Sequence, residues 1–155
     1  ALPILKRLIL SLLVGFALCA TACADSKPAV IRTADLPATA QSFLKKHFST
    51  LTVNQVTVEN KFFGKEYEVK LAGGGEIEFD KNGVWTKIDC QRNAIPESAL
   101  PSKILQYVQQ NYPSHFISSI ELEDNGGYDV EVRSIDLKHD LDLEFDSRYE
   151  FLRIG

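Results

Sequence analysis

The sequence has little cysteine and no excess of positive charge, and each shortage excludes a class of protein. Three cysteines among 155 residues are too few for a small scaffold held together by disulfides. Lysine and arginine total 17 against 21 aspartates and glutamates, and the net charge of −4 argues against a general nucleic-acid-binding protein. Hydrophobic residues make up 45% and charged residues 25%, the composition of a globular chain of one domain or two very small ones.

Long hydrophobic runs are also scarce, and the one present is too short to cross a membrane. It extends from Leu8 to Leu18, whereas a membrane-spanning helix needs roughly 20 apolar residues. Lys6 and Arg7 precede it, and Ala22-Cys23-Ala24 follows it. A basic segment, a short apolar segment and an A-x-A site are typical of an export signal, so we expect residues 1–24 to be a signal peptide. The protein is then expected in the periplasm or cell envelope.

Cys23 leaves two alternatives for the end of the mature chain. Ala20-Thr21-Ala22-Cys23 resembles a bacterial lipobox, although the usual leucine three residues before the cysteine is absent. Lipidation there would tie the protein to a membrane, whereas cleavage after Ala24, which we favour, releases it in soluble form. Loss of the leader leaves 15 basic and 21 acidic residues, a net charge of −6. Cys90 is the one cysteine beyond the leader, and we interpret it as a small buried side chain rather than a reactive thiol.

Motifs for catalysis and metal binding are missing as well. The sequence holds no G-x-S-x-G, H-E-x-x-H, P-loop or paired C-x-x-C motif. Its histidines, His47, His115 and His139, are scattered along the chain rather than spaced as metal ligands. We therefore expect no catalytic residues, no metal site and no cofactor.

What the sequence does contain is internal similarity, at an offset of 64 residues in its first part and at 61 and then 66 after a deletion and an insertion. Leu36-Pro37 recurs as Leu100-Pro101, Tyr67-Glu68-Val69 resembles Tyr128-Asp129-Val130, and the segment 76–80 resembles 142–146. Shared order at this many positions predicts a tandem duplication. The expected organisation is a signal peptide (1–24), a linker (25–34), a first repeat (35–91), a second linker (92–99) and a second repeat (100–155).

Each repeat is expected to form one helix followed by four short strands. Pro37 and Pro101 suit the first turn of a helix, and apolar residues at helical spacing follow each. Strands are expected near 52–60, 65–72, 75–80 and 84–89, and near 116–123, 127–135, 139–146 and 149–154. The predicted fold class is therefore α+β, a tandem repeat of one helix plus a four-stranded antiparallel sheet. The two sheets are expected to share a core or a continuous edge.

Alternation along the strands predicts one apolar face and one acidic face. Lys70 and Arg133 are the basic exceptions on the acidic face. This face is either a solvated surface or a binding surface for a basic partner or loosely held cations. The acids assigned to it are 13 of the 21 in the chain: Glu59, Glu66, Glu68, Glu76, Glu78, Asp80, Glu121, Glu123, Asp129, Glu131, Asp142, Glu144 and Asp146.

The turn at Asn82-Gly83 decides which way Trp85 points. A two-residue type I′ turn directs Trp85 outwards, whereas a three-residue loop turns it into the core. The equivalent outward register in the second repeat exposes Phe151 and buries Leu152 and Ile154. We predict this register, because an outward tryptophan and phenylalanine among charges are typical of a binding hot spot. The candidate partner-binding residues are Trp85, Phe151, Glu68, Glu78, Asp80, Lys70, Glu131, Arg133, Glu144 and Asp146.

Together these motifs resemble the PepSY-like family of exported bacterial proteins, which is also described as β-lactamase-inhibitor-like. The similarity runs from about Val30 to the end of the chain. It implies a concave antiparallel sheet and a non-enzymatic protein that recognises or inhibits a secreted or periplasmic enzyme. The alternative is a structural or cation-binding protein of the cell envelope. The motifs that carry the resemblance are Leu36-Pro37, Tyr67-Glu68-Val69, Glu76-Ile77-Glu78-Phe79-Asp80, Gly83-x-Trp85 and Leu100-Pro101.

Overall fold

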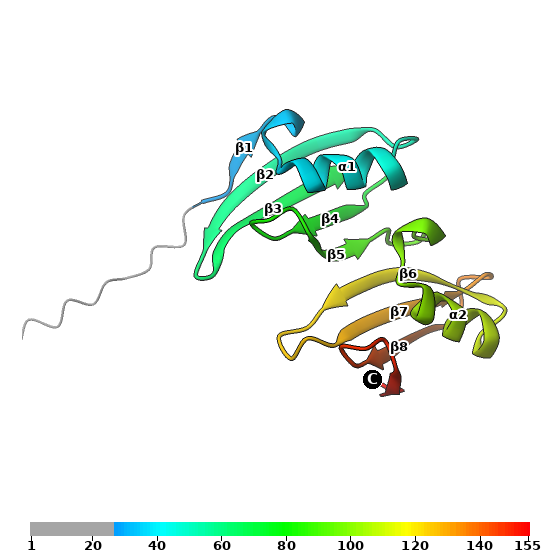
Figure 1. Cartoon of the computed structure of the whole chain (residues 1–155). Coiled ribbons are helices and arrows are strands. Elements are labelled where there is room, and N and C mark those ends of the chain that lie inside the picture. The colour runs from blue at the N-terminus through cyan, green and yellow to red at the C-terminus, as the bar shows by residue number, and fades with distance from the viewer. Residues whose placement is uncertain (1–26) are drawn as a thin grey trace, which may run out of the picture.

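Nine strands, each paired with its neighbours in the sequence, form one antiparallel sheet (Figure 1). The computed structural model describes residues 27–155, so the expected signal peptide and the lipidation alternative at Cys23 lie outside the described residues. The strands are β1 (Ala29–Ile31), β2 (Val53–Lys61), β3 (Gly64–Leu71), β4 (Glu76–Phe79), β5 (Trp85–Asp89), β6 (His115–Leu122), β7 (Tyr128–Ser134), β8 (Asp140–Phe145) and β9 (Phe151–Ile154).

Two short helices accompany the sheet, α1 (Ala38–His47) and α2 (Ser102–Asn111). Each begins directly after a proline, Pro37 or Pro101, whose fixed φ suits a helix start. Single 3-10 turns precede them, η1 (Thr33–Asp35) and η2 (Glu97–Ala99). Among the described residues, no helix has the length and apolar character needed to cross a membrane.

The predicted fold class is wrong. We expected a tandem of units, each with one helix and its own four-stranded sheet, whereas the chain forms one mostly β structure with a single nine-stranded sheet. The pairing of β5 with β6 joins the two expected sheets, and β1, in a segment expected to be a linker, pairs with β2. An unpaired edge strand leaves backbone N–H and C=O groups without partners, and the β5–β6 ladder removes two such edges.

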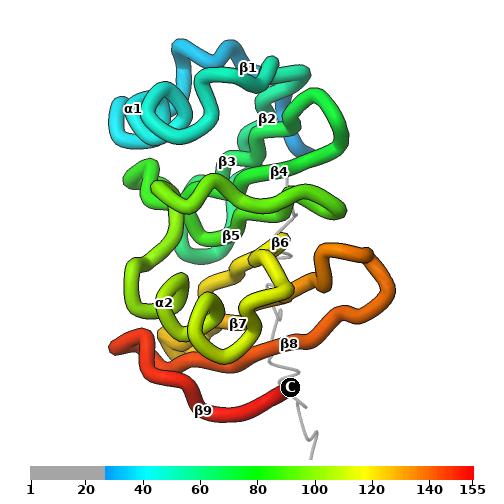
Figure 2. The backbone as a smooth tube through the Cα atoms, turned by 90° about the vertical axis from the view of Figure 1, so that its right-hand side faces the viewer, coloured from blue at the N-terminus to red at the C-terminus, as the bar shows by residue number. Residues whose placement is uncertain are grey.

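The sheet is apolar on one face because its register aligns small and branched hydrophobic residues across successive strands. Both helices pack on this face, with Ala40 and Leu44 of α1 and Ile104 and Val108 of α2 in the core (Figure 2). One continuous row of paired, buried side chains crosses the sheet from β2 to β8: Val56, Val69, Ile77, Ile88, Ile120, Val130 and Leu143.

Two turns of the sheet, β4–β5 and β8–β9, share one conformation, and it is not the predicted two-residue hairpin. The backbone N–H of Asp80 donates to the carbonyl of Val84 at 2.9 Å, which closes a three-residue loop. The Asp80 carboxylate accepts backbone N–H groups within its turn, and Asp146 does the same in the second turn. The last loop residue is left-handed in both turns, with φ of 78° at Gly83 and 66° at Tyr149.

We expect Gly83→Ala to destabilise the protein more than alanine at another left-handed glycine. A Cβ at Gly83 would lie 2.8 Å from the backbone N of Ala40 and from Cβ of Pro37, so it meets the start of α1. Gly126 has a similar φ of 83°, but its added Cβ would lie 3.7 Å from Ser147. We expect a loss in unfolding free energy of about 1 kcal/mol for Gly126→Ala and at least about 2 kcal/mol for Gly83→Ala. Urea unfolding measures both, and equal losses would contradict the contact with α1.

Candidate functional site

The face of the sheet opposite the helices, here called the open face, carries charged side chains in two rows. The rows follow from the same register that builds the core, because alternate residues of each strand point to opposite faces. The first row, from β3 to β9, is Glu68, Glu78, Lys87, Glu121, Asp129, Glu144 and Arg153. The second row, from β3 to β8, is Lys70, Glu76, Asp89, Ser119, Glu131 and Asp142.

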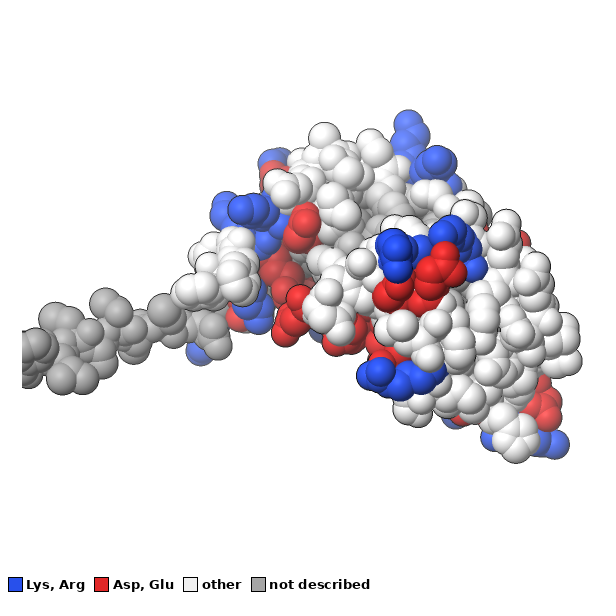
Figure 3. All heavy atoms as spheres, turned by 60° about the horizontal axis from the view of Figure 1, so that its bottom comes forward, with Lys and Arg blue, Asp and Glu red and all other residues white. Residues whose placement is uncertain are grey.

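Basic side chains neutralise part of this face. Lys87 lies 3.6 Å from Glu76, Lys70 lies 3.2 Å from Glu68, and Arg153 pairs with Glu144. On the side of the molecule that Figure 3 shows, carboxylates lie in small groups, several of them next to basic groups, with broad neutral areas between them. Within residues 27–155, no lysine or arginine forms an ion pair with the five acids of the two rows here called the unpaired carboxylates: Glu78, Asp89, Glu121, Asp129 and Asp142.

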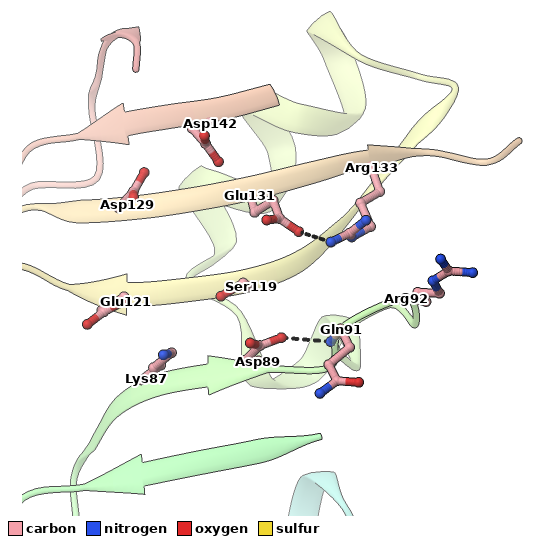
Figure 4. Close-up of a pocket in the computed structure, with 10 residues that line it drawn as sticks. All are labelled: Lys87, Asp89, Gln91, Arg92, Ser119, Glu121, Asp129, Glu131, Arg133 and Asp142. Carbon is pink, nitrogen blue, oxygen red and sulfur yellow. Dashed lines mark hydrogen bonds and ion pairs between the residues drawn. The ribbon is translucent and has the colours of Figure 1, made fainter. Parts of the chain in front are cut away.

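A hollow of about 500 Å³ opens between β5 and β8 (Figure 4). Asp129, Glu131 and Arg133 of β7 face Lys87 and Asp89 of β5 across it (Figure 4). All the residues that line it are polar or charged: Lys87, Asp89, Gln91, Arg92, Ser119, Glu121, Asp129, Glu131, Arg133 and Asp142.

Glu131 is the most firmly held carboxylate of this hollow. Its side chain pairs with Arg133 at 2.8 Å and accepts a hydrogen bond of 2.8 Å from the hydroxyl of Ser118. Ser118 is fully buried where β6 bulges against β7, so the hydroxyl is fixed by the fold. Arg133 also pairs with Asp140 at 2.9 Å. These contacts hold Glu131 and Arg133 in place before any partner arrives.

The remaining carboxylates repel one another. Burial raises the pKa of Asp129, and the charges of Asp142 and Glu144 raise it further. Burial likewise raises the pKa of Glu78, reinforced by the charge of Glu66. Both shifts mean that the folded protein opposes negative charge at these positions, so an added positive group is favoured on this face.

The negative charge of the open face also affects the pKa of Lys87. Burial lowers its pKa, but nearby carboxylates, Glu121 first among them, outweigh burial and give a raised pKa. Cys90, which follows β5 and is buried in the core, has a pKa raised to about 11, so it is a protonated thiol and not a nucleophile. Among residues 27–155, no group of three or more histidine, cysteine or acidic side chains is arranged to hold a metal ion.

The structure places the predicted site residues in three different environments. Six of them lie on the open face, within the two rows or beside them: Glu68, Glu78, Lys70, Glu131, Arg133 and Glu144. Asp80 and Asp146 bind the backbone of their turns instead. Trp85 and Phe151 pack against the core on the helix side.

The predicted outward register of the two aromatic residues is therefore wrong. Trp85 pairs with Phe79 because the loop has three residues, and its ring lies 6.1 Å from that of Tyr128. Phe151 stacks on Tyr107 of α2 with ring centroids 4.6 Å apart. Leu152 and Ile154, expected to be buried, are 52% and 55% exposed.

Several residues of the hollow were not among the predicted partner-binding residues. Lys87, Asp89 and Glu121 come together because β5 pairs with β6, whereas the sequence predicted only that the two sheets share a core or a continuous edge. Asp129 and Asp142 were assigned to the acidic face but not to the binding set. Lys87 and Asp89 flank the apolar Ile88 in the sequence. This alternation was the signal that could have placed both charged side chains on the open face.

Comparison with known proteins gives a consistent set of similarities. A family model described as "Putative beta-lactamase-inhibitor-like, PepSY-like" matches residues 23–72 and 65–153. No curated protein matches the chain. A "putative periplasmic protein" from Bacteroides vulgatus is 32% identical with a TM-score of 0.75, over 84% of this chain and 98% of that one.

Two further solved structures are similar over nearly the same length. One is a "putative calcium-regulated periplasmic protein" from Bacteroides thetaiotaomicron, 33% identical with a TM-score of 0.71, over 83% of this chain and 96% of that one. The other is a "putative periplasmic protein of unknown function" from Bacteroides vulgatus, 32% identical with a TM-score of 0.71, over 83% and 98%.

The inward placement of Phe151 predicts a loss of stability on truncation. We expect Phe151→Ala to lower the unfolding free energy by about 2 kcal/mol, because the stacked contact with Tyr107 is lost and a cavity remains. The neighbouring Leu152→Ala, at a 52% exposed side chain, is the matched control and should change stability by less than about 0.5 kcal/mol. Thermal unfolding measures the loss of stability in both variants. A larger loss for Leu152→Ala than for Phe151→Ala would support the outward register of Phe151 instead.

Removing negative charge from the open face should stabilise the protein, by an amount that depends on pH. The folded-state pKa values of Glu78 and Asp129 lie above the ordinary 4.5 and 3.8, so the folded chain binds protons there more tightly than the unfolded chain. The free-energy cost of charging Glu78 and Asp129 in the folded protein is absent at pH values below their ordinary pKa values. It appears as the pH rises through their raised pKa values. Glu78→Gln with Asp129→Asn should therefore be roughly 0.5 kcal/mol more stable than wild type at neutral pH.

Urea unfolding at a series of pH values checks this prediction. The advantage of the double variant should shrink as the pH falls through the raised pKa values towards the ordinary ones, because the wild-type carboxylates become protonated. An advantage that stays constant or grows on acidification would show that these two groups do not repel their neighbours.

Proposed function

The chain belongs to the PepSY-like family, and from that premise we propose that it is a non-enzymatic periplasmic protein whose open face binds a basic surface of a protein partner. The similar solved structures are described as periplasmic, which supports this location. Residues 1–24 would direct export, and cleavage after Ala24 would release the protein in soluble form.

The observation that carries this proposal is the set of unpaired carboxylates, of which Asp89, Glu121, Asp129 and Asp142 line the hollow. Glu121 and Asp129 are directly opposite each other in the β6–β7 ladder, an arrangement that costs stability. A surface needed only for solubility has no reason to align like charges in this way. Lysine or arginine side chains of a partner would relieve the repulsion, so the free energy stored on this face becomes available for binding.

The character of the hollow favours a protein rather than a small molecule. Pockets for small ligands are mostly apolar with a few polar groups, whereas every residue that lines this hollow is polar or charged. Charged surfaces of this kind steer encounter and select partners of opposite sign. The family description supports the finer proposal that the partner is a secreted or periplasmic enzyme that the protein inhibits.

The histidines support a non-enzymatic role. His47, in α1, lies with its Nδ1 2.8 Å from the hydroxyl of Ser98. The ring of His115 packs edge-on against Tyr112. None of the three histidines, His139 included, lines the hollow, so no imidazole is placed there to exchange protons with a substrate.

A second candidate function is collective binding of calcium by the open face. The neighbour from Bacteroides thetaiotaomicron is described as calcium-regulated, and it shares 33% identity with this chain. The mutual repulsion of Asp129, Asp142 and Glu144 would be relieved by a divalent cation as well as by a basic side chain. In this case the cation would be shared by many carboxylates rather than held in one closed site.

One pair of substitutions tests the first proposal. Glu121→Gln with Asp129→Asn removes the opposed charges, so a protein captured from cell-envelope extract by the wild type should be lost or bound at least about tenfold more weakly. Glu97→Gln with Glu150→Gln removes the same charge away from the hollow and should leave capture unchanged. Equal capture by both variants would count against the open face as the binding surface.

Calorimetric titration with Ca²⁺ separates the two functions. Heat from weak multisite binding that disappears in Glu121→Gln with Asp129→Asn would support the calcium proposal. Absence of heat in the wild type, together with loss of capture in the variant, would leave protein binding as the function of this face.

A further inference from the structure

The tip of the β2–β3 hairpin exposes two phenylalanines that nothing in the fold uses. Phe62 and Phe63 are 86% and 87% exposed, more than any other large hydrophobic residue described. Their rings contact each other edge to face with centroids 5.0 Å apart, so they form one compact apolar knob. Exposed apolar surface is unfavourable in water, and a pair concentrated at a protruding tip marks a site of contact with something outside the fold.

Lysines surround this knob. In the β2–β3 ladder Lys61 pairs with Gly64 and Lys65 with Asn60, so both lysines lie nearer the tip than Glu59 and Glu66, which pair one step further in. A surface approaching the tip therefore meets phenylalanine and lysine first. Lys61 also contacts Glu59 at 2.9 Å, an exposed pair that a stronger anion can exchange.

The neighbouring β4–β5 turn adds a third lysine. A hollow of about 400 Å³ separates this turn from the hairpin tip, and its lining includes Lys61, Phe63, Lys65 and Lys81. Asp80 and Glu66 also border it, but Asp80 is engaged by two backbone N–H groups of its own turn. Three lysines thus border the hollow beside the apolar knob.

The described chain also begins at this end of the molecule. Ala29 pairs with Val58 in an antiparallel ladder, which directs the start of β1 towards the β2–β3 tip (Figure 1). The described chain therefore starts at the same end of the sheet as the knob.

We propose that the β2–β3 tip docks on an anionic phospholipid bilayer, with Phe62 and Phe63 inserted at the interface. Aromatic residues flanked by lysines are the composition of interfacial membrane contacts, in which apolar groups enter the headgroup boundary and ammonium groups bind phosphates. A convex knob suits a deformable lipid surface better than a rigid protein pocket. Lys61, Lys65 and Lys81 would contact the headgroups.

The overall negative charge does not oppose this docking. The acidic β6–β7 turn, with Glu123 and Asp124, lies four strands from the β2–β3 tip, a distance of about 19 Å across the sheet. This exceeds the screening length of about 8 Å at physiological ionic strength, so these distant acids are screened from the tip. Docking at this corner leaves the hollow between β5 and β8 free for its own partner.

Vesicle binding by the full-length chain tests the proposal. Phe62→Ser with Phe63→Ser should weaken co-sedimentation with phosphatidylcholine–phosphatidylglycerol vesicles by roughly tenfold or more. Lys65→Gln with Lys81→Gln should weaken binding to these vesicles by about tenfold but leave binding to pure phosphatidylcholine unchanged. Ile135→Ser with Leu137→Ser, at exposed apolar residues of the β7–β8 turn, is the matched control and should have no effect.

The apolar run 8–18 could bind vesicles by itself, so a readout at the tip is also needed. Trp85 is the one tryptophan of the chain, so Phe63→Trp combined with Trp85→Phe gives a single fluorophore at the knob. Lipids with a quencher near the headgroup should quench it and shift its emission to the blue. Unquenched fluorescence, or vesicle binding unaffected by loss of both phenylalanines, would overturn the proposal. Capture of a protein by the wild type that fails only in the phenylalanine variant, without vesicle binding, would also overturn it.

Discussion

The β5–β6 ladder is the interaction on which the rest of the structure depends. Lys87 pairs with Glu121, Ile88 with Ile120 and Asp89 with Ser119, and these pairings turn two groups of strands into one sheet. On the helix side they make the buried row continuous, so α1 and α2 share a core. On the other side they create the hollow, because its walls come from β5 on one flank and from β7 and β8 on the other. The same three pairs therefore build both the core and the candidate site.

The sequence predicted the elements better than their assembly. Strand positions such as 65–72 and 84–89 agree closely with Gly64–Leu71 and Trp85–Asp89, because local alternation and turn residues determine them. The fold class failed because the joining of two strand edges depends on long-range hydrogen bonding, which leaves no local pattern. The register at Trp85 failed for a smaller reason: the carboxylate of Asp80 stabilises a three-residue loop, and Asn82-Gly83 alone does not reveal that.

The candidate site was predictable to the extent that it follows from strand alternation. Glu78, Glu131 and Arg133 lie on the open face because alternate residues of a strand must point the same way. The unpaired state of Glu121 and Asp129 was not predictable, since it depends on which strand supplies the opposite residue. Membrane docking at Phe62 and Phe63 and partner binding at the hollow use different parts of the molecule. One protein could thus be held at a surface while it presents its charged face to the surrounding space.

The strict chain order of the sheet has a consequence for how the protein acquires its structure. Every strand pairs with the one made just before it, and most ladders close loops of a few residues. Short loops cost little entropy to close, and contacts between sequence neighbours favour fast folding. A chain that emerges from one end can therefore add hairpin upon hairpin to the growing edge, except at the β1–β2 and β5–β6 ladders, where a helix separates the two strands. The time during which a bare edge can aggregate is correspondingly brief.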